Sequence, residues 1–139
     1  MKSIEVTLTE TRNEYIIRLI NILSPLILVG FRSIFHEAVE LCEENGESNK
    51  YLMTFQNFIS RISKWNNTII ENETMRIKNE SKCKYLEDLI TCVHISQLKL
   101  LTNIRVTEKS QEIEVDIPKM DTFIHRIYIE TGRRLYKNI

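Results

Sequence analysis

The stretch SKWNNTIIENETMRI, residues 63–77, contains the only Trp of the chain, followed by two acids and an Arg. Placed on a helical wheel with its neighbours from 62 to 80, it shows one apolar face. That face is formed by Ile62, Trp65, Ile69, Ile70 and Ile77. The pattern predicts a helix that packs along an apolar seam, with a break or bend around Ser63 before it.

Polar residues interrupt this apolar face. Glu73 falls near its middle, with Arg76 one turn later and Asn66 close by, whereas Glu71 points the other way. Because Glu71 and Glu73 do not face each other, the helix cannot supply a pair of catalytic carboxylates. A buried carboxylate needs a partner or a proton, so Trp65, Asn66, Glu73 and Arg76 form a candidate buried polar cluster. Two interpretations stay open: a structural ion pair, or a small polar pocket beside Trp65 for a ligand or partner.

Two helices are predicted near the N-terminus. A capping box from Thr11 to Glu14 begins the first, over about 12–23. Ser24-Pro25 is typical of a helix start and Asn45-Gly46 of a helix end, so the second helix covers about 25–45. Gly30 lies on the buried side of this second helix, where we expect another backbone to approach closely.

Further apolar patterns predict helices over about 50–62, over 83–104 and from Asp121 to the C-terminal residues. The segment 83–104 is apolar on more than one side, so we expect it at the centre of the bundle. Residues 3–8 and 112–117 alternate strictly between apolar and polar, which predicts two strands that could pair. The expected fold class is mainly α: a single domain over residues 1–139, a bundle of five or six helices with a small two- or three-stranded β element.

The most apolar run, YIIRLINILSPLILVGF at residues 15–31, resembles a membrane span. It is shorter than the ~20 residues that a span needs, and Arg18 within it is costly to insert. We therefore expect two buried helices that meet at a corner at Pro25, and no membrane span. The chain opens without a basic-then-apolar signal segment, and its three Cys lack CxxC spacing. Both features predict a reducing compartment.

The charges of the chain cancel, with 19 Lys and Arg against 19 Asp and Glu, but they are unevenly placed. An acidic patch is expected at Glu37, Glu40, Glu43, Glu44 and Glu47. A basic patch is expected at Arg126, Arg133, Arg134 and Lys137. Each patch is either a solvated helix end or one half of a head-to-tail or partner contact between complementary surfaces.

No pattern predicts catalysis, a metal site or a cofactor. The three His are isolated, and no Gly-rich loop precedes a helix to hold a phosphate. Cys92 and His94 fall on different sides of a helix, so they do not form a nucleophile and its base. The stretch HRIYIETGRRLYK at 125–137 interleaves Tyr with bases, as a nucleic-acid surface does, but Glu130 interrupts it. Nucleic-acid binding is therefore a weaker alternative.

Three stretches together resemble an uncharacterised protein family of the nucleocytoplasmic large DNA viruses of protists and algae. The first carries Lys64-Trp65-Asn66, Glu73 and Arg76-Ile77. The second carries Cys83, Leu86 and Leu89-Ile90, and the third carries Pro118, Phe123-Ile124-His125 and Tyr128-Ile129. Ser63 stands where that family usually has Pro. The resemblance implies a viral origin and assigns no biochemical role.

From these observations we expect a non-enzymatic viral protein that acts through protein–protein contacts, as a virion structural component or an assembly factor. Its partner would be another viral protein or a second copy of the chain, in the virion or in the cytoplasm of the infected host. The alternatives are a nucleic-acid-associated accessory protein that uses the basic C-terminal helix, and a regulator that binds a host protein. No cofactor is expected.

Overall fold

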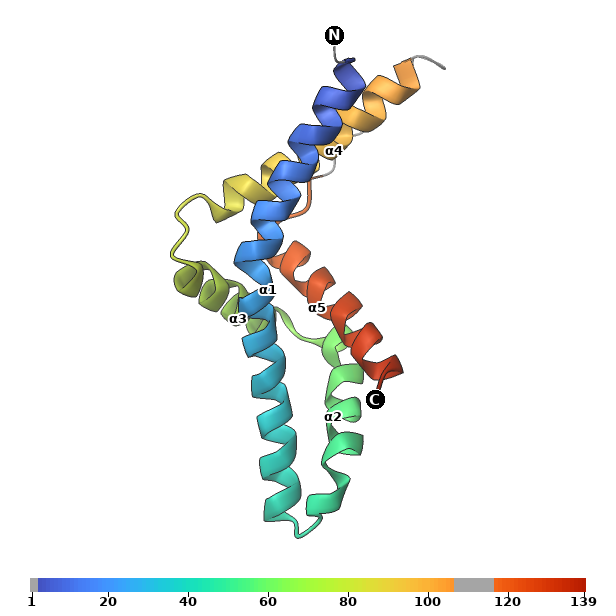
Figure 1. Ribbon diagram of the computed structural model, residues 1–139. Coiled ribbons are helices and arrows are strands. Elements are labelled where there is room, and N and C mark those ends of the chain that lie inside the picture. Colours follow the sequence, from blue (N-terminus) through green and yellow to red (C-terminus); the bar gives the residue numbers. More distant parts are fainter. Residues whose placement is uncertain (1–2, 107–116) are drawn as a thin grey trace.

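Residues 3–106 and 117–139 form a single bundle of five α-helices (Figure 1). The computed structural model describes residues 3–106 and 117–139, and over these residues it contains helices and no strand. The helices are α1 (Ile4–Glu44), α2 (Tyr51–Ser60), α3 (Asn67–Ser81), α4 (Leu86–Val106) and α5 (Met120–Lys137). Two short 3₁₀ turns, η1 (Ser48–Lys50) and η2 (Ile62–Lys64), precede α2 and α3.

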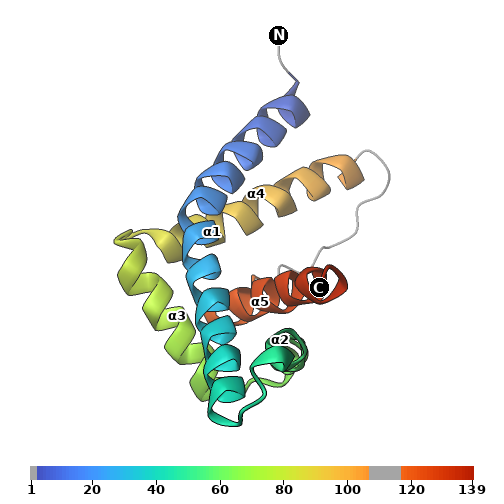
Figure 2. The same cartoon turned by 60° about the horizontal axis from the view of Figure 1, so that its bottom comes forward.

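Helix α1 is the element on which the others assemble. It has 41 residues and contacts α2, α3 and α4. Helix α4 lies beside its N-terminal half and α2 beside its C-terminal half (Figures 1 and 2). The prediction that 83–104 forms the centre was therefore wrong. Side chains such as Cys92, Ile95 and Leu98 are only half-buried, because α4 packs on one side of the longer helix.

The strand predicted over residues 3–8 is also wrong. Ser3 caps α1, with its hydroxyl oxygen accepting from the Val6 N–H at 3.2 Å, and the helix continues from Ile4. Adding residues to an existing long helix is much cheaper than nucleating a new element, so a short alternating pattern at its start does not become a strand. The second predicted strand, 112–117, lies outside the described residues except for Ile117.

The two predicted N-terminal helices are one continuous helix. Thr11 lies inside it, where its hydroxyl donates to the Thr7 carbonyl at 2.9 Å instead of capping a helix. Pro25 also lies inside α1, which changes direction near its middle (Figure 2). Pro in a helix interior costs about 3 kcal/mol. Burial of Leu19, Leu23, Ile27 and Phe31 on both sides of it offsets that cost, so the predicted corner is a bend within α1.

The segment around the quoted stretch folds as its local signals indicate. Turn η2 forms the predicted bend around Ser63, and α3 begins after Asn66, whose side-chain oxygen accepts from the Ile69 N–H at 2.9 Å. The helix predicted to begin at Asp121 begins one residue earlier, at Met120. Lys119 occupies the N-cap of α5, and Asp121 lies in its first turn, where its carboxylate accepts from the Thr122 N–H.

Helix α5 meets α1 in the core through the side chain of Tyr128. The rings of Phe31 and Tyr128 stack with centroids 5.2 Å apart, and Tyr128 is fully buried. Gly30 permits this approach, since a Cβ there would lie 2.9 Å from Tyr128 Cζ and closer still to its hydroxyl oxygen. The sequence predicts that a backbone approaches Gly30. The close neighbour is instead the aromatic side chain of Tyr128.

The substitution Gly30→Ala is expected to lower the free energy of unfolding by about 1–3 kcal/mol, because Tyr128 must move to admit the methyl group. Gly132→Ala in α5 is the matched control. Its Cβ would meet methyl groups of Ile59 and Ile62 at 3.0 and 3.2 Å, which is a milder overlap than at Gly30, so the loss of stability should be smaller. Urea denaturation of both variants tests this. A Gly30→Ala variant as stable as the wild type would contradict the crossing described.

Candidate functional site

A hydrogen-bonded network joins three helices at the seam that the sequence singles out. Arg76 on α3 donates to both carboxylate oxygens of Glu73, at 3.3 and 3.0 Å. The hydroxyl of Tyr128 on α5 donates to Glu73 at 2.6 Å, and Arg76 donates in turn to that hydroxyl at 3.2 Å. Arg76 also donates to the backbone carbonyl of Leu26 on α1 at 3.0 Å. The network therefore fixes α3 against both α1 and α5.

The protonation of this network follows from its geometry. Burial opposes the charge on Glu73, but hydrogen bonds from Arg76 and Tyr128 and the charge of Arg76 outweigh it and hold the pKa of Glu73 below its ordinary 4.5. Burial, together with the hydrogen bond to the Glu73 carboxylate, raises the pKa of Tyr128 above its ordinary value. Near neutral pH the network therefore consists of a carboxylate, a guanidinium and a neutral phenol.

Trp65 extends the network toward the surface through a tilted ring contact with Tyr128 and a stacked one with His125. Its indole lies 5.1 Å from the Tyr128 ring and 6.1 Å from the His125 ring, centroid to centroid. His125 Nε2 is 2.8 Å from the Ile62 carbonyl and must carry the proton there, because a carbonyl oxygen can only accept. Asn66 does not join the network, because it is exposed and its side chain caps α3.

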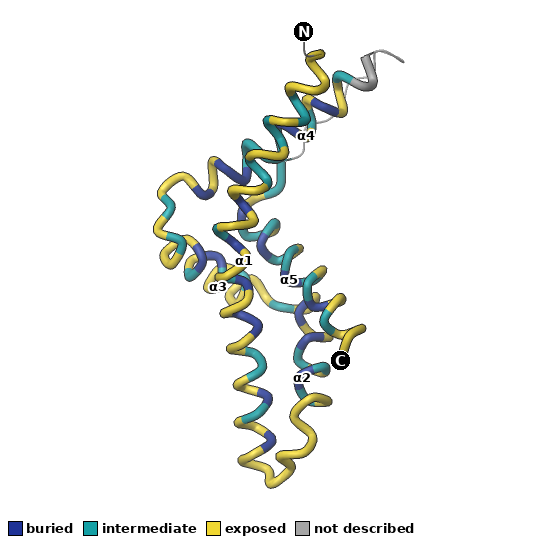
Figure 3. The backbone as a smooth tube through the Cα atoms, in the orientation of Figure 1, coloured by how far each residue is buried: buried dark blue, intermediate teal, exposed yellow. Residues whose placement is uncertain are grey.

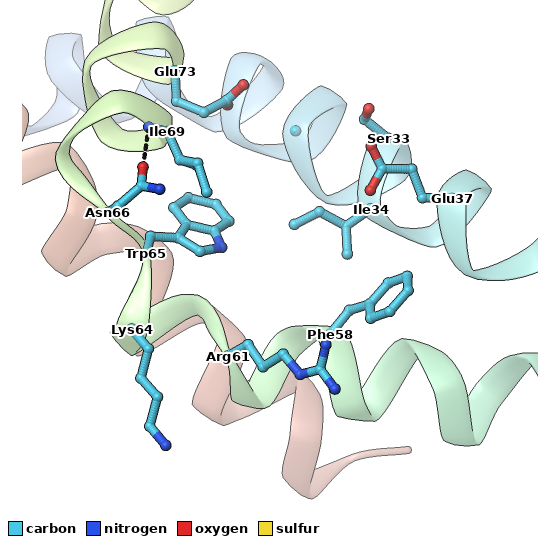
Figure 4. Close-up of a pocket in the computed structure, with 11 residues that line it drawn as sticks. Ser33, Ile34, Glu37, Phe58, Arg61, Lys64, Trp65, Asn66, Ile69 and Glu73 are labelled. Carbon is cyan, nitrogen blue, oxygen red and sulfur yellow. Dashed lines mark hydrogen bonds between the residues drawn. The ribbon is translucent and has the colours of Figure 1, made fainter. Parts of the chain in front are cut away.

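A mixed polar groove of about 710 Å³ opens beside Trp65, between α1 and the segment from α2 to α3. Trp65 and Ile34 point toward each other across it, and Lys64 points away from it (Figure 4). Glu37 lines it from α1, whereas Glu73 lines it from α3 and Arg61 from the end of α2. The polar pocket anticipated beside Trp65 thus has a geometric counterpart. The Glu73 carboxylate, however, already accepts hydrogen bonds from Arg76 and Tyr128.

A second groove, of about 650 Å³, is almost entirely apolar. Helix α1 supplies most of its lining, including Leu19, Ile20 and Leu28; Val93 comes from α4, and α5 contributes the rest. The lining from α5 is Phe123, Ile127, Thr131 and Leu135. Sequence reasoning missed this groove. One signal was available in the sequence. Residues 15–31 have more apolar side chains than a single buried helix face can hold, so some of them must lie elsewhere on the helix.

Helix α1 has enough apolar side chains to qualify as a membrane span by length and composition alone. Only 28% of its most apolar 18-residue window is buried. Core helices with many apolar residues meet the same criterion, so the expectation of no membrane span stays a prediction. The unburied part of the window includes Ile17, Ile20, Leu28 and Val29.

The part of the chain that forms the network and both grooves matches a known family model. A model described as a family of unknown function, DUF5764, matches residues 6–139. The chain belongs to this family. No curated protein and no solved structure matches the chain. The description of DUF5764 assigns neither a source nor a role, so the viral origin implied by the resemblance stays a prediction.

The two charged patches of this DUF5764 chain are both exposed. The acidic residues lie along the end of α1 and the connection to α2, and Glu47 is paired with Lys50 at 3.3 Å. The basic patch divides into two parts on α5. Helical geometry places Arg126, Arg133 and Lys137 together, whereas Arg134 falls beside the residues that line the apolar groove. Arg133 is paired with Glu130 at 2.8 Å.

The remaining candidate chemical groups are His94 and the three Cys. His94 Nδ1 lies 2.8 Å from the Ile90 carbonyl within α4, and its ring meets Phe123 edge-on. Cys42, Cys83 and Cys92 are free thiols. Over residues 3–106 and 117–139, no three His, Cys, Asp or Glu side chains come together in a way that could hold a metal ion.

Replacing Glu73 tests the energetic role of the network. Arg76 forms ion pairs with two acids. One is the half-buried Glu73, at 3.0 Å, and the other is the exposed Glu80, at 2.9 Å. Glu73→Gln is expected to lower the free energy of unfolding by about 2 kcal/mol, since a half-buried guanidinium loses its main counter-charge. Glu80→Gln removes the other carboxylate that pairs with Arg76. Because this pair is exposed, the change should lower the free energy of unfolding by less than about 0.5 kcal/mol. Equal losses in chemical denaturation would contradict this assignment.

The stability difference between the wild type and Glu73→Gln is also expected to depend on pH. A carboxylate whose pKa is lowered by folding contributes stability that is fully present above its unfolded pKa and is lost as pH falls through the folded pKa. The difference should therefore be largest near neutral pH and shrink below about pH 4.5. Urea melts across this range measure it. A difference that grows on acidification would mean that Glu73 is protonated in the folded state.

Proposed function

We propose that this protein acts through protein–protein contacts, as a structural component or assembly factor of a viral particle. The observation that carries the proposal is the open apolar groove formed by α1, α4 and α5. Large contiguous apolar patches are uncommon on the surface of monomeric proteins, and they mark interaction sites or binding grooves. Three helices that present such a surface form a suitable receptor for an apolar segment of another protein.

The polar network supports the same proposal, because it makes the surface rigid. Glu73, Arg76 and Tyr128 fix the relative positions of α1, α3 and α5, and α1 and α5 are the main walls of the groove. A binding surface that is held in place before its partner arrives loses less conformational entropy on association. The viral setting rests on the resemblance of residues 55–77, 83–105 and 117–136 to proteins of large DNA viruses.

Mass spectrometry of purified particles and of infected-cell cytoplasm tests the proposal. We expect many copies per particle that resist detergent. Incorporation of the variant Ile20→Asp/Leu28→Asp, which places charge in the apolar groove, should fall strongly. Met75→Asp is the control, because Met75 is 63% exposed on α3 and does not line the groove.

Two outcomes would contradict the proposal. One is absence of the wild-type chain from particles together with no stable protein partner in the cytoplasm. The other is equal incorporation of the groove variant and the control. Recovery of the chain on nucleic acid, with a steep dependence on salt, would instead favour the nucleic-acid alternative.

A further inference from the structure

The connection between α1 and α2 forms an acidic projection with exposed apolar side chains. We call residues 37–53 the hairpin tip. Five Glu and one Lys give it a formal charge of −4. Leu41, Leu52 and Met53 within it are 41%, 45% and 60% exposed. The hairpin tip extends away from α4, and its connection is exposed throughout (Figures 1 and 3).

The apolar groove has the opposite character. Arg32 follows Phe31 and lies one turn after Leu28, and Arg134 precedes Leu135 and lies one turn after Thr131. Because these four neighbours line the groove, helical geometry places both Arg residues beside it. Both Arg side chains are exposed, and neither makes an ion pair with any described residue. The groove is therefore apolar with two free positive charges at its edge.

We propose that the groove of one copy receives the hairpin tip of a second copy. This inference rests on the proposed function and names its partner. Leu52 and Met53 would enter the groove while the Glu side chains of the tip face Arg32 and Arg134. A volume of about 650 Å³ is within the range that accommodates several apolar groups. The charge complementarity favours this occupant, because the acidic, apolar tip matches both features of the groove.

Such a contact is heterologous, because the two surfaces lie on different parts of the chain. After two copies associate, one tip and one groove remain free, so association continues into a ring or an open chain. A symmetric contact would instead stop at a dimer. The two cases can therefore be distinguished by stoichiometry.

Two variants separate the surfaces. The tip variant is Leu52→Asp/Met53→Asp, and acids are tolerated there because both positions lie in the first turn of α2. The groove variant is Ile20→Asp/Leu28→Asp, at positions 54% and 51% exposed. Circular dichroism confirms that each variant is folded, and sedimentation velocity at low salt measures its size over a range of concentrations.

The wild type is expected to grow beyond a dimer as concentration rises, and each variant alone should stay monomeric. An equimolar mixture of the two variants should form a 1:1 dimer and nothing larger. In that mixture one intact tip meets one intact groove, and no further contact is possible. Arg134→Glu should weaken wild-type association about tenfold or more, whereas Lys137→Glu, at a residue that lines a separate pocket beside Ile59 and Ser60, should change it little. Arg134→Glu also replaces the groove variant as the test if that variant does not fold.

A wild type that stays monomeric overturns the inference, and so does a mixture that shows no dimer. These results are distinguishable from a failure of the proposed function. A monomeric wild type whose groove variant is still lost from particles would keep the proposed function and assign the groove to another protein. Self-association through tip and groove, without any incorporation into particles, would retain this inference and remove the viral assembly role.

Discussion

The ion pair of Glu73 and Arg76, completed by the hydroxyl of Tyr128, is the interaction on which the arrangement of helices depends. Each group on its own would be costly to remove from water, and together they satisfy one another. Arg76 also reaches the backbone of α1 at Leu26, so a single side chain connects α3 to both α1 and α5. A hydrophobic seam alone would permit several relative positions of these helices, whereas the network specifies one.

The length of α1 is the second constraint. Helix α1 has 41 residues and is longer than each of the helices that pack on it. Helices α2 and α4 therefore pack on different halves of it. Pro25 interrupts its hydrogen bonds without ending it, because apolar side chains before and after the bend are buried together. The same length leaves part of α1 uncovered at the groove and carries its acidic end out to the hairpin tip. Both candidate interaction surfaces therefore follow from one long helix.

The function that we propose for this fold is surface recognition. The buried polar groups are used in holding helices together, and the described residues offer two grooves of different chemistry, one mixed polar beside Trp65 and one apolar. Membership of DUF5764 extends over residues 6–139, so both grooves and the network belong to the part of the chain that defines the family. A rigid scaffold with separated acidic, basic and apolar surfaces is suited to assembly with other proteins.

The sequence by itself determined the features that depend on neighbouring residues. The helix end at Asn45-Gly46, the bend around Ser63 and the pairing of Glu73 with Arg76 all follow from local spacing and turn chemistry. Only the tertiary structure decided that Ser3 starts a helix that runs through Pro25, because burial by distant helices outweighs the local break. It also decided that Tyr128, 55 residues from Glu73, completes the ion pair, that its ring occupies the space left by Gly30, and that α1 keeps an apolar groove open. These outcomes depend on which helix faces meet, and helical periodicity identifies the faces without specifying their partners.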